Sequence, residues 1–162
     1  MMNEKTIRRL KWLCYLSLFV CVCWFLFTCF QNYNYLFNTT GRHIHWEANN
    51  KVLCYAVTIL VLYFVLTYGL IGIFITFFIH VLRGMKRDEL FPKANIMVIN
   101  IGAALIFLQT VAADNFDQIF ISEGPGQIVL TSNPFVMSLV VLVFGAMYKI
   151  AYDVAAEHDL TV

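Results

Sequence analysis

The chain has 162 residues, of which 60% are hydrophobic and 13% are charged, and its formal net charge is +1. Globular domains are about 45–50% apolar and about 25% charged, so a water-soluble domain of this size would leave much of its apolar surface exposed. The small net charge gives no reason to expect direct binding of nucleic acid. The composition therefore excludes an ordinary soluble domain and predicts that lipid is the solvent.

Four stretches lack Asp, Glu, Lys and Arg for about the length that a bilayer requires. A hydrocarbon core of about 30 Å needs about 20 apolar residues in a helix. With polar ends trimmed, the sequence predicts membrane-spanning helices near residues 12–30, 53–82, 94–113 and 135–152. All four are continuously apolar, whereas the strands of a membrane β-barrel alternate. We therefore predict one all-α membrane domain, residues 1–162, folded as an antiparallel bundle of four transmembrane helices.

The first and fourth stretches each have an alternative interpretation. Four basic residues precede the first, as in a secretory signal peptide, but its apolar run exceeds the usual ~7–15 residues and no small-residue cleavage site follows. We expect a permanent helix. The fourth stretch meets Lys149 early, but an ammonium near a helix end can extend to the headgroups, and Pro134 suits a first helical turn.

Basic residues are distributed unequally between the two sides of these helices. Lys and Arg are retained on the cytoplasmic side, while acidic residues affect orientation little. Arg42 and Lys51 fall on one side, and the other nine basic residues fall on the opposite side: Lys5, Arg8, Arg9, Lys11, Arg83, Lys86, Arg87, Lys93 and Lys149. The distribution predicts a multi-pass protein with both termini and the loop 83–93 in the cytoplasm.

The segment 116–131 has two β-prone runs around a Gly-Pro-Gly turn, which predicts a short extracytoplasmic β-hairpin between the third and fourth helices. Asp114, Asp117 and Glu123 make this outer surface acidic. Sensing of a cation or peptide is one interpretation of the segment, and a structural lid is the other.

Metal and disulfide sites have only weak signals. His43, His45 and Glu47 would share one face of an extended strand, which suits a zinc-type ion, although a solvated loop also explains them. Cys29 and Cys54 are expected at similar depth near the outer ends of neighbouring helices, where a disulfide is feasible. Alternatively, all five cysteines are small apolar fillers. We predict no cofactor.

Polar residues within the spans are few, and none that ionises lies near the middle of a span, where ion-coupled carriers usually need one. Two sets of residues are expected to serve helix packing, one through hydrogen bonds and one through small size. The first set is Thr58, Thr67, Tyr68, Asn100 and Gln109, and the second is Gly69, Gly72, Gly102, Ala103, Gly145 and Ala146.

Two cytoplasmic segments are candidate contact surfaces. The loop residues Arg83, Lys86, Arg87 and Lys93 are expected to attract anionic lipid, at about 1 kcal/mol per basic residue. At the C-terminus an acidic helix end is followed by an apolar tip. This tail suits docking on a partner, folding back on the loop, or simple fraying. Its candidate docking residues are Glu157, Asp159, Leu160, Thr161 and Val162.

The second half of the chain resembles a family of small bacterial four-helix membrane proteins known only as a domain of unknown function. Leu90-Phe91-Pro92-Lys93-Ala94-Asn95, Ile101-Gly102 and the closing Glu157-x-Asp159-Leu160-Thr161-Val162 carry the resemblance; the first half agrees only in hydropathy. Genes of that family often lie beside one for a helix-turn-helix regulator. The resemblance implies a bacterial inner-membrane location and a cytoplasmic transcription regulator as partner, and it supplies no catalytic residue.

We therefore predict a non-enzymatic inner-membrane protein that acts as a sensor or anchor for a cytoplasmic helix-turn-helix regulator. A homo-oligomeric permease or channel subunit is the alternative, with a path that depends on Asn100 or Gln109. A third reading is an enzyme that uses the outer histidines and acids and loses activity on His43→Ala.

Overall fold

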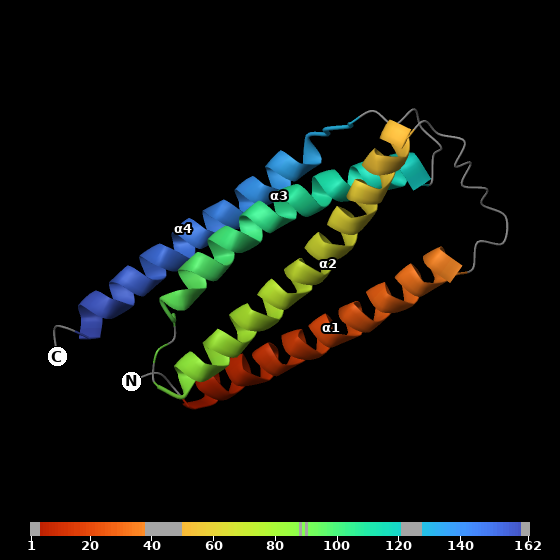
Figure 1. Cartoon of the computed structure of the whole chain (residues 1–162). Helices are drawn as coiled ribbons and strands as arrows, with labels where there is room; N and C mark the ends of the chain where they lie inside the picture. The colour runs from red at the N-terminus through yellow and green to blue at the C-terminus, as the bar shows by residue number, and fades with distance from the viewer. Residues whose placement is uncertain (1–3, 38–49, 88, 90, 121–127, 160–162) are drawn as a thin grey trace.

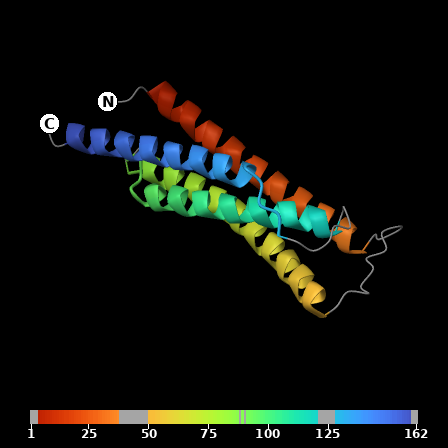
Figure 2. The same cartoon turned by 90° about the horizontal axis from the view of Figure 1, so that it is seen from above.

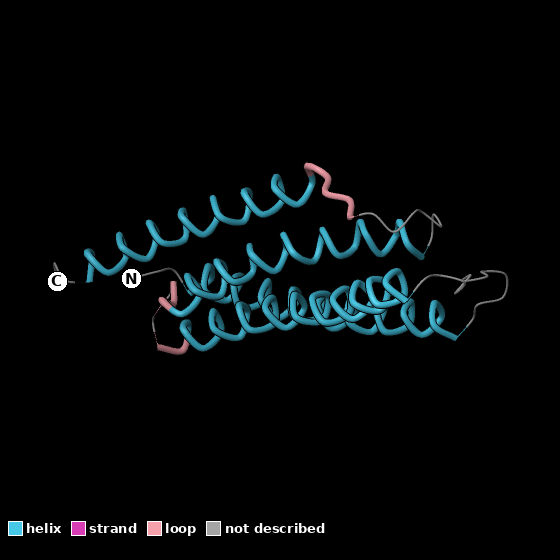
Figure 3. Tube along the Cα trace, turned by 45° about the horizontal axis from the view of Figure 1, so that its top comes forward, coloured by secondary structure: helices cyan, strands magenta, loops and turns pink. Residues whose placement is uncertain are grey.

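The computed structural model describes residues 4–37, 50–87, 89, 91–120 and 128–159, which form four helices and no strand (Figure 3). The helices are α1 (Glu4–Phe37), α2 (Asn50–Met85), α3 (Ala94–Phe120) and α4 (Asn133–Asp159). Each is long and apolar enough to cross a membrane, so the four predicted spans are confirmed as apolar helices. Each helix is also longer than the span predicted for it, and the 36 residues of α2 correspond to about 54 Å.

Consecutive helices run antiparallel and lie beside one another in chain order (Figure 1). Helix α1 packs on α2, α2 on α3, and α3 on α4, and within the described ranges no close backbone contact joins α1 to α3 or α4, or α2 to α4. The molecule is therefore an open row of helices, in which α3 lies between α2 and α4 and α1 is attached through α2 alone.

Helices α1 and α2 meet along only part of their length. Near the start of α1, Cys14 is buried with Val81 and Met85 of α2. Further along, the ring of Phe25 lies edge-on to Tyr68, with centroids 5.6 Å apart. Beyond this point the two helices separate, as Figures 1 and 2 both show. The N-terminal half of α2 therefore packs elsewhere.

That half of α2 packs against the C-terminal half of α3. Ala56 and Ile59 are buried against Phe116, and Tyr63 stacks on Phe116 with ring centroids 4.4 Å apart. Phe116 belongs to the segment predicted to form a hairpin. That prediction is wrong for the described residues, because α3 continues to Phe120 and residues 128–131 form no strand. Packing of Phe116 on α2 overrides its local β-propensity.

Helix α4 is the most exposed of the four. Only 6% of its most apolar stretch is buried inside the molecule. Pro134 lies in its first turn, as predicted, and is buried. The outward side chains of α4 are largely apolar, and in a protein of this composition such a face is suited to contact with lipid.

The antiparallel arrangement brings the start of α1, the end of α2, the start of α3 and the end of α4 to one end of the molecule (Figure 1). This end carries the nine basic residues that the sequence assigns to one side of the membrane, and we call it the basic end. The segments that join α1 to α2 and α3 to α4 lie at the opposite end. The grouping agrees with the predicted topology.

Candidate functional site

A buried asparagine joins three helices at the basic end. Asn95 lies in the first turn of α3 and is 0% exposed. Its Oδ1 lies 3.1 Å from Nδ1 of His80 on α2. Its Nδ2 donates to the Tyr148 hydroxyl on α4 at 3.3 Å and to the carbonyl oxygen of Phe77 at 3.4 Å. We call this cluster of Asn95, His80 and Tyr148 the Asn95 hub.

Tyr148 also fastens α4 to the turn between α2 and α3. Its hydroxyl donates to the carbonyl oxygen of Pro92 at 3.3 Å. Its ring lies edge-on to Phe91 at 5.5 Å and to Phe77 at 6.0 Å between centroids. One aromatic side chain therefore contacts α2, the turn and α3, which fixes the position of α4 relative to the basic loop.

The turn itself depends on a glycine. The amide nitrogens of Arg87 and Glu89 donate to the carbonyl oxygen of Gly84 at 2.8 and 2.9 Å, which closes the chain after α2. A Cβ atom at Gly84 would lie 2.5 Å from the Glu89 carbonyl oxygen and 2.5 Å from Cγ of Pro92. Any larger residue there would push backbone and proline apart, so the close approach requires glycine.

A second buried asparagine organises the opposite end. Asn115 of α3 is 0% exposed, and its Oδ1 accepts hydrogen bonds from the Tyr55 hydroxyl at 2.9 Å and the Val129 amide at 2.8 Å. Its Nδ2 donates to the Val129 carbonyl oxygen at 2.8 Å. Nearby, Thr131 donates to Oδ2 of Asp114 at 2.7 Å. The segment 128–131 is thus attached to α3 by side chains.

An apolar groove lies between α2, α3 and α4 on the side of the Asn95 hub. We call it the α3 groove because Val98, Ile99, Gly102 and Ile106 of α3 form its floor. Its volume is about 300 Å³. The walls are Leu70, Ile73, Phe74, Phe77 and Phe78 of α2, and Val141, Phe144 and Tyr148 of α4.

The predicted contact residues fall into two groups. Arg83, Lys86, Arg87 and Lys93 are exposed at the basic end, as is Glu157 near the end of α4. Asp159 ends α4, but its side chain lies outside the described residues, as do Leu160, Thr161 and Val162. His43, His45 and Glu47 also lie outside them. The part of the chain that the structure describes contains no metal-binding group of His, Cys, Asp and Glu.

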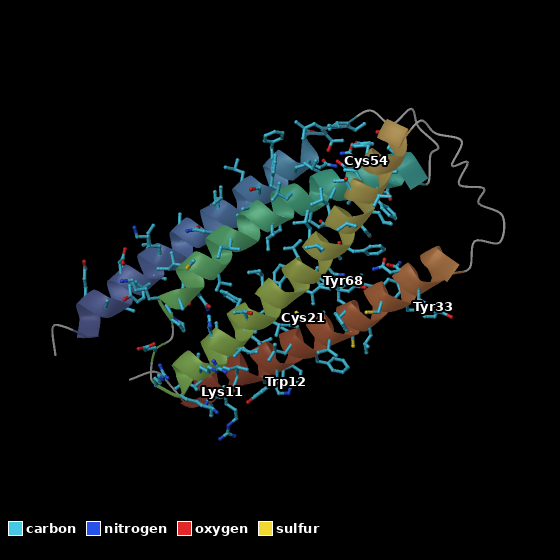
Figure 4. The ribbon with its side chains drawn as sticks, in the orientation of Figure 1. Lys11, Trp12, Cys21, Tyr33, Cys54 and Tyr68 are labelled. Atoms are coloured by element: carbon cyan, nitrogen blue, oxygen red, sulfur yellow. The ribbon has the colours of Figure 1, made fainter. Side chains whose placement is uncertain are left out.

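Cys29 and Cys54 do not lie at similar depth, contrary to prediction. Cys29 Sγ accepts a hydrogen bond from Tyr68 at 3.6 Å, and Tyr68 is 14 residues further along α2 than Cys54. That separation corresponds to about 21 Å of helix. Figure 4 shows Cys54 close to the start of α2 and Tyr68 well along it. Both thiols are free, because the antiparallel register of α1 on α2 places Tyr68, and not Cys54, level with Cys29.

Only some of the residues expected to mediate packing do so. Tyr68 accepts a hydrogen bond from Asn32 at 3.0 Å, and Gly145 and Gly102 lie within tight contact of Ile99 and Ile73. Thr58 instead bonds to a carbonyl of its own helix. Gly72 has no atom within 4 Å of its Cβ position. Thr67 is buried, but its Oγ1 has no hydrogen-bond partner in the described ranges.

Sequence reasoning missed the residues that join the helices most directly. The contact residues that the sequence predicts do not include Asn115, Tyr55, His80 or Tyr148. Asn95 was selected as a motif residue without a structural role. An amide inside an apolar span, or directly after one, is the signal that would have found both asparagines, because a buried amide must be hydrogen-bonded.

The chain matches no known family model, no curated protein and no solved structure. The resemblance to the bacterial four-helix family therefore stays a prediction. The motif residues Phe91 and Asn95 nevertheless meet at Tyr148, and Gly102 lies two turns further along α3 in the floor of the groove.

Proposed function

We propose that the protein is a non-enzymatic membrane anchor or sensor for a cytoplasmic protein, which it contacts through its basic end. The premise is that the four apolar helices span the bacterial inner membrane with the basic end in the cytoplasm. The excess of Lys and Arg at that end supports this orientation. A helix-turn-helix transcription regulator is the partner that the family resemblance suggests.

The observation that carries the proposal is the projection of α4 beyond α3. Gly145 packs on Ile99, and α3 begins at Ala94, so the antiparallel register brings α4 level with the start of α3 near Ile150. The nine following residues of α4, about 13 Å of helix, extend past it, and Figure 1 shows this overhang. Exposed Asp153 and Val154 lie on it.

The overhang is held in a fixed position beside the basic loop. Tyr148 binds Pro92 and Asn95 at the base of the overhang, and Gly84 closes the loop itself. A partner would therefore meet a preformed surface of basic loop residues and an acidic helix end. Such a surface suits a protein with its own mixed charges, since electrostatic complementarity favours specific association.

Site-specific photo-cross-linking in native membranes tests this proposal. A benzophenone side chain at Val154, which is 57% exposed on the overhang, should yield an adduct with a DNA-binding protein identified by mass spectrometry. The same side chain at Val140, which is 47% exposed farther from the basic end, serves as the matched control and should not. Deletion of residues 157–162 should remove the adduct. Labelling of lipid alone at Val154 would refute the proposal.

The alternative of a homo-oligomeric permease or channel subunit has one specific observation in its favour. Asn100 is exposed on α3, about 9 Å along the helix from Ala94, and its side chain makes no hydrogen bond within the described residues. An exposed amide in a membrane span favours association of helices. This alternative predicts self-adducts in cross-linking and solute flux in liposomes that Asn100→Leu abolishes.

A further inference from the structure

The α3 groove exists because α2 and α4 flank α3 without close backbone contact between them. Gly102 contributes no side chain to the floor, and Phe74, Phe78 and Phe144 form parts of the two walls. From Val98 to Ile106 the floor extends for about 12 Å along α3. It lies within the membrane-length segment Ala94–Gln118. In a bilayer the opening of the groove therefore meets hydrocarbon.

The lining of the groove suits hydrocarbon and not water. All lining side chains are apolar except Tyr148, whose hydroxyl already bonds to Pro92 and Asn95. A buried water needs two or more polar partners, which this lining does not offer. Since an apolar cavity of about 150 Å³ accommodates benzene, a volume of about 300 Å³ accommodates on the order of twelve carbon atoms. That amount corresponds to much of one acyl chain.

Two lysines stand beside the end of the groove that Tyr148 closes. Lys149 follows Tyr148 in the chain, and Lys93 follows Pro92, whose carbonyl oxygen accepts the Tyr148 hydrogen bond at 3.3 Å. Because consecutive Cα atoms are about 3.8 Å apart, the Lys93 backbone lies next to this contact, and the Lys149 backbone lies next to the base of the Tyr148 side chain that makes it. Both side chains are exposed. A ligand with an apolar chain in the groove would therefore carry its anionic group close to two ammonium groups.

We propose that the α3 groove binds one acyl chain of an anionic phospholipid, with the lipid phosphate at Lys93 and Lys149. The lipid comes from the leaflet on the side of the basic end, because the groove starts there. The site differs from general attraction of headgroups to the basic loop, since it requires the shape of the groove as well as the charge. It shares with the proposed function only the insertion of the chain into a membrane.

Retention of lipid through purification tests the site. The whole chain is reconstituted in vesicles of equal parts dioleoyl phosphatidylglycerol and dioleoyl phosphatidylcholine, extracted in mild detergent, and analysed by mass spectrometry. The unmodified chain should retain about one phosphatidylglycerol per chain. Val141→Phe, which fills the groove, should reduce retention at least fivefold. The matched control is Val140→Phe, whose side chain is exposed, and it should retain lipid as the unmodified chain does.

If Val141→Phe and the unmodified chain retain equal amounts of lipid, the proposal that lipid binds in the groove is wrong. If the unmodified chain retains the two lipids equally, the proposed preference for anionic lipid is wrong. The double variant Lys93→Gln/Lys149→Gln should abolish that preference while lipid is still retained. A preference that survives this variant would refute the role of the lysines.

A labelling experiment on the unmodified chain covers the case in which Val141→Phe fails to fold. Phosphatidylglycerol with a diazirine in its acyl chain is activated by light in the same vesicles, and the labelled residues are mapped. Labels should concentrate on Ile99, Ile106 and Val141. Labels spread over the exposed faces of α1 and α4, with none in the groove, would overturn the proposal. Partner binding plays no part in either measurement, so the two proposals fail separately.

Discussion

At the scale of single residues, two buried asparagines provide most of the specific contacts between elements. An amide both donates and accepts, so one side chain can satisfy groups on several elements. Asn95 links α2, α3 and α4, whereas Asn115 bonds both the amide and the carbonyl of Val129. In an apolar molecule, where packing alone discriminates poorly between neighbouring registers, such bonds specify one arrangement of the helices.

Replacing Asn95 should therefore destabilise the protein. Asn95→Leu leaves His80 Nδ1 without its partner and removes the bond to Tyr148, so the free energy of unfolding should fall by about 1–3 kcal/mol. Unfolding by sodium dodecyl sulfate, followed by circular dichroism, measures the change. Thr67→Val is the control, since its buried hydroxyl has no partner in the described residues, and it should leave stability unchanged or higher. Equal destabilisation by both variants would contradict the role of the Asn95 hub.

At the scale of helices, α3 holds the molecule together because it contacts both α2 and α4. Small residues let these neighbours approach it: Ala103 is 1% exposed, and a Cβ atom at Gly145 would lie 3.1 Å from Cγ2 of Ile99. Helix α1, by contrast, has close backbone contact with α2 alone among the described helices, and it presents many exposed aromatic and aliphatic side chains. Helix α4 depends on its close fit to α3, so its position should be sensitive to added volume.

Gly145→Leu tests this dependence. The added side chain collides with Ile99 and should reduce the free energy of unfolding by about 1–3 kcal/mol, the usual effect of overpacking. Gly72→Leu adds the same atoms where nothing lies within 4 Å of the Cβ position, so its effect should be small. The unfolding assay used for Asn95 compares the two variants. A Gly72→Leu variant as unstable as Gly145→Leu would show that a general loss of glycine, and not the α3 contact, is responsible.

At the scale of the whole molecule, the fold sorts charge along its long axis. Helices that run antiparallel bring basic residues from four separate segments to one end, although these residues are up to 144 positions apart, from Lys5 to Lys149. The opposite end holds the segment that Asn115 fastens to α3. A bilayer with its cytoplasmic face at the basic end is the arrangement that this distribution favours.

Labelling of single cysteines checks that orientation. In a variant without its five native cysteines, Ile128→Cys should react with a membrane-impermeant maleimide in intact cells, because residue 128 is exposed at the opposite end. Lys86→Cys, at the basic end, should react only after the cells are permeabilised. The reverse pattern would place the basic end outside and would remove the premise of a cytoplasmic partner.

The amino-acid sequence by itself determined the number of helices, their membrane-spanning length and their alternating direction. These follow from the length of apolar runs and the placement of charge, which are local properties of the sequence that govern insertion and orientation in a bilayer. The sequence also pointed to Asn95 and Gly102 through a motif, but it could not show that one joins three helices and the other opens a groove.

Only the tertiary structure decided which residues meet. The register of α1 on α2 separates Cys29 from Cys54, and the stacking of Phe116 on Tyr63 extends α3 through a segment with β-propensity. Helix faces that are apolar all round carry little information about their neighbours, because lipid satisfies them as well as another helix does. Which of these helices pack together therefore depends on close packing at small residues and on a few buried hydrogen bonds. Both exist only once the helices are assembled.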